Sequence, residues 1–153
     1  DYKIGGIIAN LPKNSEVTNV FNTGNIKVQT SNNYLQIGGI AGATGCSDTV
    51  KINNAYNIGK IKLENSNSQN IGSISGSMKL VTLSNCFYLA GTYNVGVGKG
   101  DSTGIIELQS ISDFPSVLNV VNSGNESAFV EDTNNANDGY PILNWQYEQT
   151  IEN

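Results

Sequence analysis

The sequence contains no histidine and no arginine, and these two absences exclude much of the chemistry that proteins perform. Without histidine the chain has no imidazole base, no Ser-His-Asp or Cys-His catalytic pair, and no imidazole ligand for zinc or copper. Without arginine it lacks the planar guanidinium that binds phosphate or guanine through two parallel hydrogen bonds. The residues that remain favour a structural or binding role over catalysis.

Charge is also scarce, because Asp, Glu and Lys together make up only 14% of the residues. All eight cations are lysines that precede residue 100, whereas residues 100–153 carry nine carboxylates and no cation. A net charge of −5 without a basic stripe predicts no nucleic-acid partner. Asparagine and glycine are abundant instead, and the regularly spaced aliphatic and aromatic residues among them indicate a folded chain.

Cysteine is rare and long apolar runs are missing. Cys46 and Cys86 are the only thiols, and since the sequence alone does not pair them, we expect two separate thiols. No apolar run approaches the roughly 20 residues of a membrane span, which predicts no membrane insertion within this segment. No signal peptide or sorting signal is present and the first residue is Asp1, so we interpret the chain as a piece of a longer protein.

The most informative feature is an internal repeat with a period of 33 to 34 residues. Its first motif, Ile-Gly-Gly-Ile or Ile-Gly-Ser-Ile, occurs at Ile4–Ala9, Ile37–Gly42 and Ile71–Gly76. Its second motif, in which aliphatic, Asn and aromatic residues alternate, occurs at Val17–Gly24, Ile52–Gly59 and Leu83–Ala90. This period of two, the β-branched residues and the Gly and Asn punctuation predict strands, not helical repeats of similar length.

We expect each repeat to be one coil of a β-solenoid, with equivalent residues of successive coils about 4.8 Å apart. The stacking predicts an aliphatic ladder, an asparagine ladder and an aromatic ladder: Val17, Ile52 and Leu83; Asn19, Asn54 and Asn85; Phe21, Tyr56 and Phe87. All three ladders share one parity, which we assign to the interior. The opposite face would then carry Val20, Ala55 and Cys86, and the glycine pairs would mark bends of the coil.

These motifs resemble the GLUG-motif repeats of bacterial surface proteins, which also accompany immunoglobulin A1 metallopeptidase domains of Gram-positive bacteria. The resemblance rests on Ile37–Gly42, Asn54–Ile61 and Ile71–Gly76, and it covers residues 4–92. Residues 124–146 are similar to a segment that closes such repeats in Clostridium-like surface proteins. The resemblance implies a solenoid at the cell surface, outside any catalytic domain, and no defined ligand. Ser73 and Ala90 depart from the motif where it has glycine.

The repeat pattern is lost after Gly91, and we expect the Gly-rich stretch Asn94–Asp101 to be a flexible connection. The only predicted helix starts near Ser112 or Asp113, has a proline in its first turn and ends at Ser123-Gly124. Its apolar stripe would be Phe114, Val117, Leu118 and Val121.

Two short strands are predicted after this helix, at Ala128–Glu131 and Ile142–Tyr147. A solenoid exposes its last, unpaired coil, and such an edge needs a cover. We therefore interpret the helix, the Tyr140-Pro141 turn and Trp145 as a cap on the last coil.

Several residues have side chains that could bind a ligand or take part in catalysis. The loop Asp132–Gly139 has oxygen atoms at alternating positions as a calcium loop does, but Ala136 and Asn137 stand where a ligand and a glycine are required, which favours an ordinary Asx turn. Lys99 follows a Gly-rich stretch, yet Gly100 stands where a phosphate loop needs Ser or Thr. The internal acids of the repeats, Glu16, Asp48 and Glu64, fall in different coils or loops, which speaks against catalysis by paired carboxylates.

The tyrosines leave one binding mode open. Exposed Tyr34, Tyr88 or Tyr93 on an Asn-rich face would suit stacking on sugar rings, although ladder and cap positions are the commoner place for such residues. We predict no catalytic, cofactor-binding or metal-binding residue.

Taken together, the patterns predict an all-β protein, a parallel β-helix-like solenoid of about three coils with a small α+β cap. Residues 1–92 would be the repeats and residues 93–153 the capping region of the same single domain. The expected function is that of a non-catalytic, extracellular module, either a stalk or an adhesion domain. The alternative is a carbohydrate-binding module or an accessory domain of a larger secreted enzyme. Expected partners are a host or matrix protein, a glycan, or neighbouring domains of the parent chain.

Overall fold

The structure, a computed structural model, describes residues 2–44, 49–79, 81–122 and 127–151. The chain forms two compact units, residues 1–107 and 108–153. The first unit is built from short strands that pair in parallel, so the prediction of a mostly β chain is confirmed.

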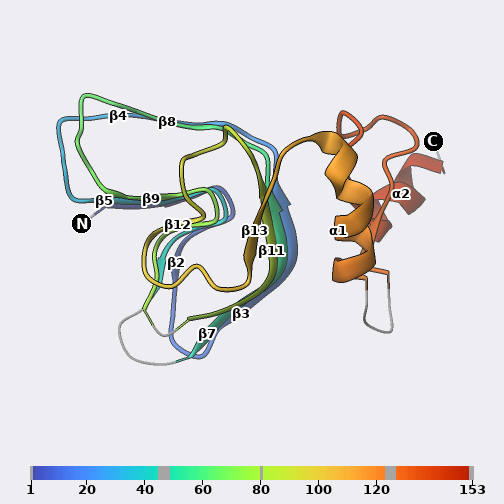
Figure 1. The fold of residues 1–153 in the computed structure, drawn as a ribbon, viewed down its shortest axis with the longest axis horizontal. Coiled ribbons are helices and arrows are strands. Elements are labelled where there is room, and N and C mark those ends of the chain that lie inside the picture. The colour runs from blue at the N-terminus through green and yellow to red at the C-terminus, as the bar shows by residue number, and fades with distance from the viewer. Residues whose placement is uncertain (1, 45–48, 80, 123–126, 152–153) are drawn as a thin grey trace. The chain divides into compact units, whose positions relative to one another are not determined.

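Equivalent strands of successive repeats pair with one another and form four ladders, which Figure 1 views end-on. The first ladder contains β1 (Tyr2–Gly5), β5 (Leu35–Gly38) and β9 (Asn70–Gly72). The second contains β2 (Ile8–Leu11), β6 (Ala41–Thr44), β10 (Ser75–Ser77) and β12 (Val97–Lys99). The third contains β3 (Glu16–Asn22), β7 (Val50–Asn57), β11 (Val81–Leu89) and β13 (Ile105–Leu108). The fourth contains β4 (Ile26–Gln29) and β8 (Ile61–Glu64).

The strand register follows the repeat seen in the sequence. In the first ladder, Ile37 lies opposite both Ile4 and Ile71. In the third ladder, Ile52 lies opposite Val17 on one side and Leu83 on the other, as predicted for the aliphatic ladder. The predicted stacking of these residues in successive repeats is therefore confirmed.

Glycines end the strands of the first ladder because the chain bends sharply there into the second ladder. A Cβ atom at Gly5 or Gly38 would lie 2.0 Å from the carbonyl oxygen three residues later, and one at Gly72 would lie 2.2 Å from it. Such a distance is far inside van der Waals contact, so only glycine permits this bend. The bends predicted at the glycine pairs are confirmed.

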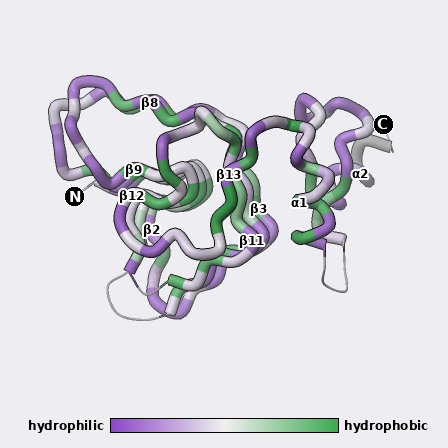
Figure 2. Tube along the Cα trace, viewed as in Figure 1, coloured by the Kyte–Doolittle hydropathy of each residue, from purple (hydrophilic) through white to green (hydrophobic). Residues whose placement is uncertain are grey.

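Two apolar cores lie between the ladders. The larger core, between the second and third ladders, contains the fully buried Ile40, Ile52 and Ile74. The smaller core, between the first and fourth ladders, contains Leu35 and Ile37. Hydrophilic residues gather in the loops that join β4 to β5 and β8 to β9 (Figure 2). Burial of the apolar side chains in the two cores, each contributing about 1.5–3 kcal/mol, is the main force that holds the repeats together.

The asparagine ladder marks a bend that β3, β7 and β11 share, because the one-to-one register of these strands continues on both sides of it. Asn19, Asn54 and Asn85 all have left-handed backbones, with φ of 55°, 51° and 51°. Their side chains form a chain of amide hydrogen bonds: Asn54 Nδ2 donates to Asn19 Oδ1 at 3.2 Å, and Asn85 Nδ2 donates to Asn54 Oδ1 at 2.9 Å. Asparagine tolerates this backbone better than other side chains do. The predicted amide stack is confirmed.

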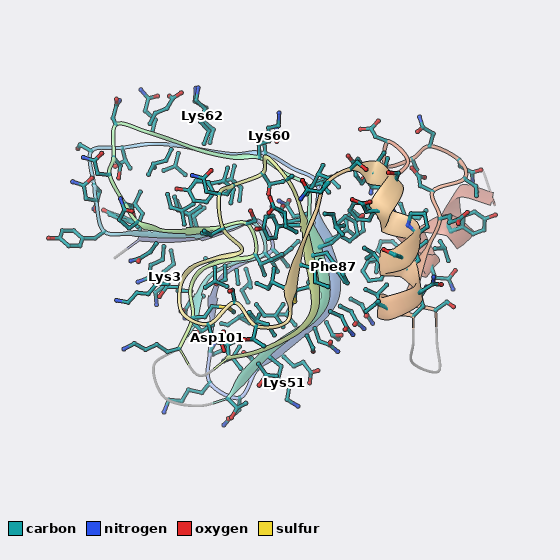
Figure 3. The ribbon with its side chains drawn as sticks, in the orientation of Figure 1. Lys3, Lys51, Lys60, Lys62, Phe87 and Asp101 are labelled. Carbon is teal, nitrogen blue, oxygen red and sulfur yellow. The ribbon has the colours of Figure 1, made fainter. Side chains whose placement is uncertain are left out.

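This bend reverses the predicted sidedness of the residues that follow it in each strand. Val20, Ala55 and Cys86, predicted to lie on the outer face, pack in the larger core together with the aliphatic ladder. The aromatic ladder keeps its register, and Phe21 stacks on Tyr56 at 5.1 Å between ring centroids. However, Phe87 lies on the opposite face of its strand from this core (Figure 3), and the register places Phe21 and Tyr56 on the same face as Phe87. The left-handed residue shifts the alternation by one position, so Val20, Ala55 and Cys86, and not the aromatic ladder, share the larger core with the aliphatic ladder. The predicted burial of the aromatic ladder is confirmed at Tyr56 and Phe87, which are 1% and 2% exposed.

Replacing Asn54 by alanine should lower the free energy of unfolding by about 2 kcal/mol. Alanine disfavours the left-handed backbone by about 1 kcal/mol, and both amide hydrogen bonds to the neighbouring rungs are lost, at about 0.5 kcal/mol for each of these partly buried bonds. Chemical denaturation measures the change. Asn54→Gly, which removes the amide but tolerates the backbone, should cost about half as much. Equal costs for the two variants would show that the backbone conformation contributes nothing.

The stacking does not end at residue 92. The stretch Asn94–Asp101, expected to be a flexible connection, contains β12, in which Val97 pairs with Ser75 and Lys99 with Ser77. Strand β13 then joins the third ladder beside β11. The pattern was missed because Val97-Gly98-Lys99 keeps only the central glycine of Ser75-Gly76-Ser77.

The second unit contains the predicted helix. The short 3₁₀ helix η1 (Ile111–Asp113) leads into α1 (Phe114–Val121), whose first turn holds Pro115, as predicted. The predicted end of the helix at Ser123-Gly124 lies outside the described residues. The capping role predicted for this unit stays a prediction.

Strands β14 (Phe129–Val130) and β15 (Ile142–Leu143) form an antiparallel pair, but the second is shorter than predicted. Residues 144–147, predicted to continue the strand, begin α2 (Asn144–Ile151). Gln146 Oε1 accepts a hydrogen bond from the Leu143 backbone N–H at 2.9 Å, which is the return bond of a helix-capping box. This local bond, invisible to a search for alternating residues, favours the helix over a longer strand.

Candidate functional site

The first unit carries a polar groove in the outer corner between the first and second ladders. Its volume is about 350 Å³. Lys3, Tyr34, Lys79 and Lys99 are the charged or aromatic residues that line it. The remaining lining residues have amide or hydroxyl side chains: Asn33, Gln36, Thr44, Asn70 and Ser77. No carboxylate is among the lining residues that the structure describes.

The strand register builds the two walls of the groove. One wall is a rung of the first ladder, in which Gln36 lies between Lys3 and Asn70. The other wall includes the end of the second ladder, where Ser77 pairs with Lys99. Neighbouring parallel strands lie about 4.8 Å apart, so the groove extends over roughly 14 Å from the layer of Lys3 to that of Lys99, three strand spacings away. The groove is thus an elongated surface, not a closed pocket.

Two of the three lysines are held in place by neighbouring side chains. Lys3 Nζ donates a hydrogen bond of 2.8 Å to Asn10 Oδ1, which joins the two ladders across the corner (Figure 3). Thr44 Oγ1 accepts the backbone N–H of Lys79 at 3.1 Å and donates to its carbonyl oxygen at 3.4 Å. The first bond holds the ammonium group of Lys3, and the other two hold the backbone of Lys79, while both lysine side chains stay exposed.

The three tyrosines considered for sugar stacking have different surroundings. Tyr34 is 74% exposed at the edge of the groove. Tyr88 is buried in the larger core, and burial next to Glu107 raises the pKa of its hydroxyl. Tyr93 packs against the smaller core. Only Tyr34 of the three therefore offers an open ring face.

The internal acids of the repeats are not brought together. Glu16 begins β3, opposite Lys51, whereas Glu64 ends β8 in another ladder. Glu64 forms ion pairs with Lys62 at 3.0 Å and Lys27 at 3.3 Å, and its hydrogen bonds to these lysines lower the pKa of its carboxyl group. Asp48 lies outside the described residues. Glu64 thus takes part in surface ion pairs, and Glu16 and Glu64 form no carboxylate pair.

The Asx-rich loop of the second unit is organised by its own first residue. Asp132 Oδ2 accepts the backbone N–H groups of Asn137 at 2.7 Å and Gly139 at 2.9 Å, and Asp132 Oδ1 accepts that of Ala136 at 2.8 Å. The carboxylate is therefore occupied by the turn itself, in the manner of an Asx turn. In the first unit, Lys99, which follows the Gly-rich stretch, is the last residue of strand β12 and is not part of a phosphate loop.

Cys86 is completely buried in the larger core, and this burial raises the pKa of its thiol to about 12. Its Sγ atom lies 3.5 Å from the carbonyl oxygen of Ile52. Cys46 lies outside the described residues. A neutral, enclosed thiol next to small apolar neighbours has a packing role, not a nucleophilic one.

We expect Cys86 to resist alkylation in the folded protein. Iodoacetamide reacts with the thiolate, which is nearly absent at about pH 8 when the pKa is so high. In a Cys46→Ser variant, mass spectrometry should show no labelling over a time in which the unfolded protein is fully labelled. Labelling of the native protein at the unfolded rate would contradict the placement of Cys86 in the core.

No known protein family, curated protein or solved structure matches this chain. In the part of the chain that the structure describes, no helix has the length and apolar character needed to cross a membrane. Within the same residues, no three His, Cys, Asp or Glu side chains are grouped so as to hold a metal ion. What the chain does must therefore be inferred from its own repeats and from the groove.

Proposed function

We propose that this chain is a β-solenoid module of a bacterial cell-surface protein, with a structural or adhesive role and no catalytic one. The observation that carries the proposal is the parallel, in-register pairing of equivalent strands in successive repeats. A stack of this kind grows by a constant step per repeat, so it is suited to hold other domains at a set distance.

The resemblance of the motifs to GLUG repeats supports a place outside the cell. So does the way in which the repeats are joined, because Asn22, Asn57 and the asparagine ladder link them through amide hydrogen bonds. Such links are insensitive to ionic strength, unlike surface ion pairs. The partners proposed for this module are the neighbouring domains of its parent chain and a host or matrix protein or glycan.

A second candidate function, a carbohydrate-binding module or the accessory domain of a secreted enzyme, is supported by the groove. Tyr34 offers an exposed ring beside amide and hydroxyl side chains, which is the combination that sugar rings and their hydroxyl groups require.

Duplication of one repeat tests the structural proposal. A second copy of Leu35–Ser68 is inserted between Ser68 and Gln69, so that the added strands meet the same neighbours as the original ones. The longer chain should fold and unfold at a higher denaturant concentration, because it contains one more interface between repeats.

The matched control carries the same 34 residues in scrambled order at the same place. That insert cannot pair with either neighbour and should lower stability. If the true and scrambled inserts behave alike, the repeats are not interchangeable coils and the proposal fails.

A further inference from the structure

We infer that the groove lined by Lys3, Lys79, Lys99 and Tyr34 binds an anionic polysaccharide, one that carries carboxylate or sulfate groups along a linear chain. The inference rests on the second candidate function, carbohydrate binding, and deepens it by naming the class of carbohydrate; the structural role by itself requires no such groove.

The charge of the groove is the first step. Three of the eight lysines of the chain line it, and no described lining residue is a carboxylate. In the described residues, Lys3, Lys79 and Lys99 take part in none of the ion pairs, in contrast to Lys27 and Lys62, which share Glu64. The first unit as a whole has eight lysines and six carboxylates, whereas the second has seven carboxylates and no lysine. Positive charge is therefore concentrated in the unit that holds the groove.

The shape of the groove is the second step. Lys3 stands in the layer of the first repeat, Lys79 follows β10 in the third, and Lys99 ends β12 in the fourth. At about 4.8 Å per layer, these positions distribute the charge over roughly 14 Å along the direction of stacking. A linear polymer with regularly spaced anions can contact all three positions, whereas a single small anion cannot.

The neutral residues of the groove indicate which chemical groups of the ligand lie between its anionic groups. Asn70 and Ser77 provide amide and hydroxyl groups that can donate to and accept from sugar hydroxyl groups. Tyr34 provides the ring against which the apolar face of a pyranose stacks. Nucleic acid is disfavoured, because the chain has no arginine and the groove has a single exposed aromatic ring where base stacking uses several.

Isothermal titration calorimetry at low ionic strength tests the inference with defined probes. They are oligomers of polygalacturonate, which are carboxylated, dextran sulfate, neutral dextran, and a thymidine homopolymer. Wild-type protein should bind polygalacturonate or dextran sulfate, and the tighter of the two identifies the preferred anion. It should not bind neutral dextran, and its affinity for the thymidine homopolymer should be lower.

The decisive comparison uses two triple variants with the same change of charge. Lys3→Gln/Lys79→Gln/Lys99→Gln alters the groove, whereas Lys51→Gln/Lys60→Gln/Lys62→Gln alters lysines that lie elsewhere (Figure 3). The groove variant should lose about tenfold or more in affinity, since each exposed charge contact contributes a factor of a few. The control variant should retain most of its affinity, and both should unfold close to the wild-type denaturant concentration, because the exposed bonds that Lys3 and Lys62 make contribute little to stability.

Tyr34→Ala provides a separate check on the sugar ring. It should weaken polygalacturonate binding severalfold, whereas Tyr34→Phe, which keeps the ring, should not. Four results would overturn the inference: no binding of either anionic polysaccharide, equal losses in the two triple variants, tighter binding of the thymidine homopolymer, or unchanged affinity in Tyr34→Ala. None of these results bears on the duplication test, so the polysaccharide proposal can fail while the proposal of stacked repeats holds, and the reverse.

Discussion

Replacing Asn57 by alanine is expected to lower the free energy of unfolding by about 3–4 kcal/mol. Asn57 is completely buried, and its amide closes a turn by donating to Gly59 O at 3.0 Å and accepting from Gly59 N at 3.2 Å. It also accepts a 2.8 Å hydrogen bond from Asn22 Nδ2 in the preceding repeat. Alanine would leave the buried backbone groups of Gly59 unpaired, at about 1–3 kcal/mol for each.

Asn22→Ala is the matched control, because Asn22 makes the same turn with Gly24 one repeat earlier. Gly24 is exposed, so water can replace the lost partners, and the cost should be about 1 kcal/mol. Denaturant unfolding of both variants gives the comparison. Equal costs would mean that Asn57 is as accessible to water as Asn22, against the enclosed position described here.

Gly59→Ala should have an effect of similar size, at least about 3 kcal/mol. A Cβ atom at Gly59 would lie 2.0 Å from the carbonyl oxygen of Gly24, a backbone atom of the preceding repeat. No side-chain movement can relieve such an overlap, so the two repeats would have to separate locally, and overpacking of a buried site is costly.

Gly24→Ala is the corresponding change in the first repeat. Its Cβ atom would meet nothing closer than Asn22 Oδ1 at 3.4 Å, an ordinary contact. The free energy of unfolding should change by less than about 0.5 kcal/mol. A large cost at Gly24, or none at Gly59, would show that the stacking of the two repeats is not as described.

The sequence predicts the repeats well because stacking imposes the same demands on every layer. An aliphatic residue must face Ile52 from both neighbouring strands, and the first-ladder bends at Gly38 and Gly72 admit no side chain. These constraints recur at a fixed period and are visible without a structure. Strand β12 escaped notice because it is shorter and shares only the central glycine with its neighbours.

The sidedness of the third ladder was predicted wrongly for a local reason. A count of alternating positions assumes that every residue has an extended backbone, but the left-handed backbone of Asn54 bends the strand and returns Ala55 to the core. Asparagine recurs at the same position of all three second motifs, which is visible in the sequence. After glycine, asparagine is among the residues that most readily adopt a left-handed backbone. A left-handed backbone assigned to this asparagine would have placed Cys86 in the core.

The groove could not be predicted from any single motif. Lys3, Lys79 and Lys99 belong to different strands or loops and are separated by up to 96 positions. Only the bend between the first and second ladders, together with the alignment of β12 on β10, brings them to one corner. An alignment of Val97–Lys99 with Ser75–Ser77 would have been the signal that places Lys99 there.

The central claim, that successive repeats stack in parallel and in register, is tested most directly by disulfide formation between exposed positions of the fourth ladder. Lys27 lies opposite Lys62 in β4 and β8. Their Cα atoms should be about 4.8 Å apart, within the range of a disulfide. Lys60 lies two residues before Lys62, so its Cα atom should be about 8 Å from that of Lys27, beyond that range.

The measurement compares Lys27→Cys/Lys62→Cys with Lys27→Cys/Lys60→Cys, both in a Cys46→Ser/Cys86→Ala background under mild oxidation. Alanine already occupies the rung next to Cys86, at Ala55, so the background should fold. The account predicts a rapid intramolecular disulfide between positions 27 and 62, and a slow or absent one between positions 27 and 60. Equal rates for the two pairs, or a faster reaction of the second, would contradict the stacked register.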